Sequence, residues 1–107
     1  MKTIEVEHTG GPEVLHIRDI GGLEPPGPGQ ALVCVLAAGV NFMDIGQRRG
    51  SYPRQVPFTP GMEGAGIVES IGDDSNVIAP SGRVAFADQP GAYAEAILRS
   101  RIVNRLL

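Results

Sequence analysis

The segment between residues 39 and 63 carries four polar side chains whose types and spacing could support chemistry. Asn41, Asp44 and Tyr52 lie in the stretch GVNFMDIGQRRGSYP, and Glu63 follows in GMEGAG. An amide offers a hydrogen-bond donor and an acceptor, and a phenol can donate to a carbonyl oxygen. A carboxylate in a half-closed cleft can order water or transfer a proton. The segment therefore contains the groups that a polar cleft needs.

Each of these side chains also has a purely structural interpretation. Asn41 could cap a short helix that follows it, with Asp44 placed favourably for the helix dipole. Glu63 could pair with an arginine such as Arg48, and Tyr52 could pack at the rim of its loop. The capping role and the cleft role of Asn41 do not exclude each other, so the residues alone leave both open.

Other residues that could carry chemistry give weaker signals. Cys34, the single cysteine, lies in an apolar run, which predicts a buried core residue and favours a cytoplasmic protein without disulfides. His8 and His16 are too isolated to predict a metal site. The glycines of residues 61–66 follow the order G-x-x-G-x-G with no helix after them. They therefore predict a close-packed strand and not a dinucleotide fingerprint.

Length, composition and charge limit the class of protein. The 107 residues fit one domain, and 42 % of them are apolar, enough for a core. Fifteen glycines and nine prolines predict many turns and short strands. The net charge of −3 comes without the basic face of a nucleic-acid binder. The longest apolar run is about half a membrane span, and no hydrophobic signal segment starts the chain, so we expect a soluble protein without nucleic-acid or membrane partners.

The elements that must position the polar side chains follow from the apolar patterns. The run QALVCVLAAGV predicts a central strand buried on both faces, and residues 42–49 predict a short helix that stops at Gly50. Proline-rich segments predict surface loops at 21–29 and 51–61. The predicted strands cover residues 2–8, 14–20, 30–40, 61–72, 83–87 and 92–98. This order predicts a mainly β barrel with one short helix after the central strand.

Several motifs, all in register, resemble one known family. GGPEVL, GVNFMDIGQRRGSYP, PFTPGMEGAGIVESIG, GRVAF and GAYAE are similar to the zinc-independent, zeta-crystallin-like quinone oxidoreductases of the medium-chain dehydrogenase/reductase superfamily. The similarity runs from about Met1 to Glu95. It implies that residues 1–107 form the N-terminal catalytic domain, a GroES-like, partly open β-barrel truncated before the nucleotide-binding Rossmann domain.

The resemblance also implies a site without zinc. Asn41 matches a cysteine ligand of the catalytic zinc in alcohol dehydrogenases of the superfamily, and Met62 matches a histidine ligand. An amide and a thioether are poor zinc ligands compared with thiolate and imidazole. The cysteine-rich lobe that binds structural zinc in those enzymes has no counterpart in this sequence. We therefore expect no metal in the site.

In complete members of the family, NADPH reduces a quinone or an α,β-unsaturated carbonyl compound. The resemblance implies that Asn41, Phe42 and Tyr52 contact the cofactor, with Asn41 near the nicotinamide. Asn41, Tyr52 and Asp44 are the catalytic candidates. Because the family holds the pyrophosphate in its Rossmann domain, we expect the isolated chain to be inactive unless such a half completes it. Exposed apolar surface could also lead it to form a homodimer.

Two other functions would also fit parts of the sequence, and two stretches of it differ from the pattern of the family. Enoyl reductases share the Asn-Phe-x-Asp corner of residues 41–44, and a non-enzymatic GroES-like binding module would need an apolar mobile loop that the proline-rich loops lack. Pro80-Ser81-Gly82 stands where relatives have Pro-Gly-Asp, so the turn there is in question. The ending RSRIVNRLL, residues 99–107, lacks the expected aspartate and prolines, and it predicts a terminal strand or a helical tail.

Overall fold

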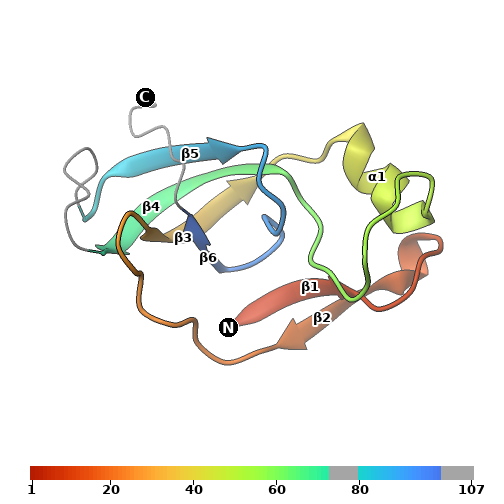
Figure 1. The fold of residues 1–107 in the computed structure, drawn as a ribbon, viewed down its shortest axis with the longest axis horizontal. Helices are drawn as coiled ribbons and strands as arrows, with labels where there is room; N and C mark the ends of the chain where they lie inside the picture. Colours follow the sequence, from red (N-terminus) through yellow and green to blue (C-terminus); the bar gives the residue numbers. More distant parts are fainter. Residues whose placement is uncertain (73–79, 100–107) are drawn as a thin grey trace.

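The computed structural model describes residues 1–72 and 80–99, and this part of the chain is mainly β with one short α-helix (Figure 1). The mainly β prediction is confirmed. The predicted C-terminal tail lies outside the described residues from position 100 onward. The elements are β1 (Lys2–Val6), η1 (Pro12–Val14), β2 (Leu15–Asp19), β3 (Ala31–Ala38), α1 (Phe42–Arg49), β4 (Glu63–Ile71), β5 (Arg83–Ala87) and β6 (Ala96–Arg99).

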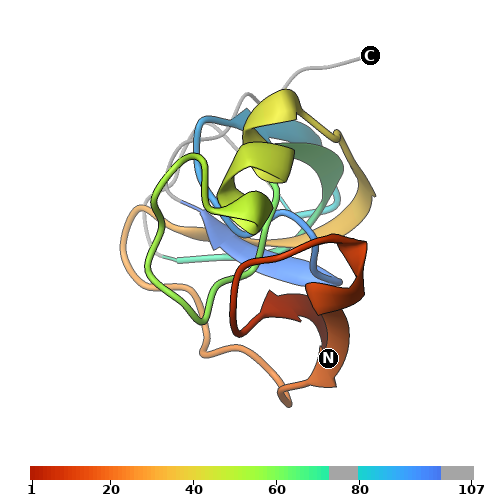
Figure 2. The ribbon, with the colours of Figure 1, turned by 90° about the vertical axis from the view of Figure 1, so that its right-hand side faces the viewer.

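The strands form two antiparallel sheets. One is the β1–β2 hairpin, and the other has the strand order β5-β4-β3-β6. Isolated bridges join Thr3 to Ala94 and Val6 to Phe58, so the hairpin closes part of the barrel that the larger sheet leaves open. Figure 2, which looks along the long axis, shows α1 above the hairpin. The main core lies on one face of the larger sheet and contains Ala31, Val33, Val68, Val84, Phe86, Ala92 and Ile97.

The glycines of β4 allow the strands to approach closely, as the sequence predicts. A Cβ atom on Gly66 would lie 2.0 Å from the Cys34 carbonyl oxygen, and one on Gly64 would lie 2.6 Å from the Phe86 ring. No side chain fits at such distances, because the contact at Gly66 is with backbone that cannot move aside. The G-x-x-G-x-G order therefore serves strand packing.

The prediction that the central strand is buried on both faces is wrong. Ala31 and Val33 of β3 are buried, whereas Leu36 is 69 % exposed and Cys34 is exposed rather than a core residue. An antiparallel sheet commonly packs one face on the core and leaves the other uncovered. Both faces of this strand carry apolar side chains, so its sequence does not distinguish the covered face from the open one.

Several predicted boundaries also shift. The first strand ends at Val6, residue Val14 belongs to the 3-10 turn η1, and β6 begins at Ala96 instead of residue 92.

None of the helices in the described residues is long and apolar enough to span a bilayer.

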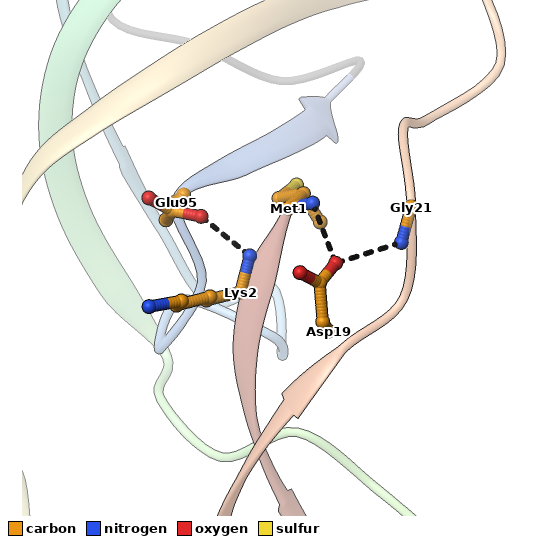
Figure 3. A network of polar contacts seen from close by, with 5 residues as sticks. All are labelled: Met1, Lys2, Asp19, Gly21 and Glu95. Carbon is orange, nitrogen blue, oxygen red and sulfur yellow. Dashed lines mark hydrogen bonds and ion pairs between the residues drawn. The ribbon is translucent and has the colours of Figure 1, made fainter.

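Polar contacts fix the start of the chain between the two sheets (Figure 3). The Met1 ammonium donates to Asp19 Oδ1 at 3.0 Å, and the Lys2 N–H donates to the Glu95 carboxylate. The hydrogen bond from the ammonium, with a second from the Gly21 N–H, lowers the pKa of Asp19. These contacts connect β1 to β2 on one side and to the segment before β6 on the other.

Candidate active site

The corner between β3 and α1 determines where Asn41 lies. After β3 ends, Asn41 has extended backbone (φ −117°, ψ 158°) and occupies the N-cap of α1, where its N–H donates to the Asp44 side chain. The helix ends at Gly50, whose φ of 94° is left-handed, the conformation that glycine adopts without strain. The predicted cap position and helix stop are both confirmed. The amide therefore lies at the carboxyl end of the central strand.

Asp44 points into the protein beneath this corner. Its side chain is 4 % exposed, and Oδ2 accepts hydrogen bonds from the Asn41 N–H and from the Tyr93 hydroxyl, each at 2.9 Å. Oδ1 is buried without a hydrogen-bond partner among the described residues. Asp44 is thus more than a first-turn helix charge, because it connects α1 to the segment that leads into β6.

The environment of Asp44 alters two neighbouring groups. Burial, together with the hydrogen bond to Asp44 and its charge, raises the pKa of Tyr93 far above its ordinary value, so the phenol remains a donor. Burial lowers the pKa of Arg54, an effect that the charge of Asp44 opposes. The Arg54 guanidinium donates to the Thr59 carbonyl at 3.1 Å and lies 4.3 Å from the centre of the Phe58 ring.

Asn41 faces a cavity on the other side of the corner. The cavity has a volume of about 210 Å³ and is lined by Asn41, Met43, Met62, Glu63, Ala87 and Asp88. Asn41 and Met62, for which the resemblance implies zinc-ligand positions, therefore border the same space. Asn41 Nδ2 donates to Glu63 Oε2 at 3.1 Å. Glu63 thus contacts Asn41, whereas Arg48, its proposed partner, donates to the Gly10 carbonyl.

The other predicted site residues lie farther from this cavity. Phe42 adjoins Asn41 and is 75 % exposed. Tyr52 is 45 % exposed and lies beyond the C-terminal end of α1, with its ring against Gly46 and its N–H bonded to the Gly46 carbonyl at 3.1 Å. Asp44 borders a separate cavity of about 170 Å³. The structure brings Asn41 together with Asp44 and Glu63, whereas Tyr52 packs against the middle of α1 and does not line the cavity.

Several residues of this region could not be assigned from the sequence. Tyr93 lies 49 positions from Asp44, and Asp88 reaches the cavity from the loop after β5. No local pattern signals either contact. Tyr93 stands in the GAYAE motif, which was a signal for the family but not for this partner.

The side chains that line the cavity with Asn41 are suited to binding neutral polar ligands. No three His, Cys, Asp or Glu side chains of residues 1–72 and 80–99 are grouped as a metal site would require. The cavity combines an amide, two thioethers and two carboxylates. Such a set can hydrogen-bond a carbonyl or a carboxamide group while apolar surface contacts a ring.

Comparison with known proteins agrees with the fold. The model of the family described as alcohol dehydrogenase GroES-like domain matches residues 27–100. Quinone oxidoreductase of Rattus norvegicus is 40 % identical over 101 residues, which cover 92 % of this chain and 31 % of the rat protein. Quinone oxidoreductase of Pseudomonas aeruginosa is 44 % identical over 96 residues, which cover 88 % of this chain and 29 % of that protein.

A solved structure shows the same similarity in three dimensions. Escherichia coli quinone oxidoreductase, complexed with NADPH, matches with a TM-score of 0.85 and 34 % identity over 92 % of this chain and 30 % of its own. The chain spans about three tenths of the length of these relatives. The resemblance inferred from the motifs is confirmed, and the chain belongs to the family of alcohol dehydrogenase GroES-like domains, with quinone oxidoreductases among its relatives.

Proposed function

We propose that this chain forms the acceptor-binding side of an NADPH-dependent reductase of quinones or α,β-unsaturated carbonyl compounds. The observation that carries the proposal is the position of Asn41, whose amide borders a cavity of about 210 Å³ at the end of β3. A quinone has flat apolar faces and carbonyl oxygens that accept hydrogen bonds. The cavity offers complementary groups, because Met43 and Met62 line it beside the amide.

The residues of the chain would bind and polarise the acceptor. NADPH, when bound, supplies the hydride for the reduction. Asn41 donates from Nδ2 to the carbonyl oxygen of the acceptor and stabilises the negative charge that this oxygen gains. Met43 and Met62 exclude water from the ring, which strengthens the hydrogen bond because the local dielectric constant falls. In this proposal no metal polarises the acceptor, since Asn41 and Met62 stand at the two ligand positions.

The cavity suits the nicotinamide end of NADPH and not its pyrophosphate. The carboxamide of a nicotinamide can exchange hydrogen bonds with Asn41. Glu63 and Asp88 line the same cavity, and two carboxylates repel a phosphate. We therefore assign the pyrophosphate to a different part of the enzyme. Tyr52, whose ring packs against Gly46 and which does not line this cavity, would contact the cofactor rather than the reacting carbonyl.

Exposed apolar side chains on β3, in the turn after it and at the start of α1 support a docking surface for that other part. Leu36, Val40 and Phe42 are each at least 69 % exposed, and Met43 is 43 % exposed. Such a group on a soluble domain commonly marks an interaction site. Since the chain spans about three tenths of its relatives, we assign this surface to a nucleotide-binding domain, which would also bring the cofactor against Phe42.

A fusion protein tests the proposal. The chain is joined to the unmatched remainder of Escherichia coli quinone oxidoreductase, the relative solved with NADPH, and NADPH absorbance is followed with an ortho-quinone. We expect the fusion to oxidise NADPH and the isolated chain to leave it unchanged. Turnover by the isolated chain would disprove the need for a second domain. A fusion that folds and binds NADPH but reduces enoyl thioesters and no quinone would assign the chain to enoyl reduction instead.

A further inference from the structure

Gly39 leaves room for the Glu63 side chain to extend to Asn41. The Glu63 side chain lies across Gly39, where a Cβ atom would come within 2.6 Å of Oε1 and 2.8 Å of Cγ. The backbones of the two residues are also joined, because the Gly39 N–H donates to the Glu63 carbonyl at 3.2 Å. The carboxylate is thereby directed to the end of β3, where it accepts from Asn41 Nδ2 at 3.1 Å.

Two hydrogen bonds with Asp44 hold the backbone of Asn41 in place. Its N–H donates to Asp44 Oδ2 at 2.9 Å, and its carbonyl accepts from the Asp44 N–H at 3.0 Å. In the described residues the Asn41 side chain makes no hydrogen bond to the first turn of the helix. Because one Nδ2 hydrogen is directed to Glu63, the second Nδ2 hydrogen is available to a ligand.

We infer that Glu63 is a positioning residue, which orients the Asn41 amide so that an Nδ2 hydrogen, and not the amide oxygen, faces the cavity. Without the carboxylate the amide could rotate by half a turn and present an acceptor, which would repel a carbonyl oxygen. Glu63 is exposed, so the hydrogen bond is weak in water. It strengthens when a ligand covers the cavity, because the dielectric constant around the pair falls. The inference deepens the proposed function and rests on it.

An NMR experiment on the 107-residue chain tests the inference without any ligand. The side-chain amide signals of Asn41 are followed while the pH is lowered through the range in which carboxylates take up protons. Three carboxylates lie near this amide: Glu63 on β4, Asp44 on α1 and Asp88 after β5. Comparison of the chain with Glu63→Gln isolates the contribution of Glu63, and Glu69→Gln, at an exposed position of the same strand, is the matched control.

We expect the amide signals to move with pH in the unmodified chain and in Glu63→Gln to lose most of that movement, while Glu69→Gln retains it. Glutamine can still accept a hydrogen bond, so solvent exchange of the Asn41 side-chain hydrogens should keep the rate of the unmodified chain in Glu63→Gln and become several-fold faster in Glu63→Ala. Equal pH dependence in the chain and in Glu63→Gln, or unchanged exchange in Glu63→Ala, would overturn the inference. Failure of the proposed function would instead appear as a positioned amide that does not respond to a quinone.

Discussion

The Tyr93 hydroxyl donates a hydrogen bond to Asp44 Oδ2 at 2.9 Å, although the two residues lie 49 positions apart. The same oxygen accepts from the Asn41 N–H, so a single buried atom connects the segment before β6 to the start of α1. The position of the Asn41 amide therefore depends on a tertiary contact as well as on the helix cap.

Tyr93→Phe should destabilise the protein by about 1–3 kcal/mol, because it removes a hydrogen bond to a buried carboxylate whose other oxygen has no hydrogen-bond partner in the described part of the chain. Urea unfolding, followed by circular dichroism, measures the change. Tyr52→Phe is the matched control, since Tyr52 is exposed, and it should change stability by less than about 0.5 kcal/mol. Equal effects of the two variants would argue against a structural role for the Asp44–Tyr93 contact.

The alkaline stability of the fold should depend on Tyr93. Burial and the contact with Asp44 raise the pKa of this phenol above its ordinary value of about 10. Above that pH the unfolded chain releases a proton that the folded chain keeps, so the free energy of unfolding falls as the pH rises. Tyr52→Phe leaves Tyr93 as the sole tyrosine, and its phenolate absorbance then reports the shift directly. A titration midpoint at or below the ordinary value would contradict the described environment.

Ser81→Gly should stabilise the protein by about 0.5–1 kcal/mol. Ser81 has a φ of 71°, which lies in the left-handed region that favours glycine. Its N–H donates to the Val68 carbonyl at 2.8 Å, so the unusual turn is bonded to β4. Thermal or urea unfolding detects the gain. Ser51→Gly, at an exposed serine outside the positive-φ residues, should give no gain, and a similar gain there would remove the conformational explanation.

Asn41→Leu in the fusion protein should lower kcat/KM for the quinone by about 10²-fold or more, the usual cost of removing one donor that stabilises an oxyanion. NADPH oxidation under steady-state conditions measures the loss. Gln55→Leu removes an amide at an exposed position and should leave kcat/KM unchanged. If Asn41→Leu retained full activity in a folded fusion, the amide would have no role in polarising the acceptor.

The fold was predictable from the sequence to the extent that it depends on local patterns. Alternating apolar residues, the prolines and Gly50 predict the strands, the loops and the end of α1. The exposure of Cys34 was not predictable, because both faces of β3 are apolar and burial depends on which face the rest of the chain covers. The same limit applies to the site. Asn41 could be identified from its place after an apolar strand, whereas Glu63, 22 positions away, becomes its partner only when β3 and β4 pair.

The central claim is that the cavity beside Asn41 binds a quinone, and an NMR titration of the chain with a neutral anthraquinone tests it most directly. Anthraquinone lacks the reactive ring positions that the exposed Cys34 thiol could attack, so the titration reports reversible binding. We predict saturable shifts of the Asn41 side-chain amide and of the Met43 and Met62 methyl groups, with smaller changes at Tyr52. Shifts confined to other surfaces, or an absence of shifts at saturating quinone with the fold intact, would contradict the account.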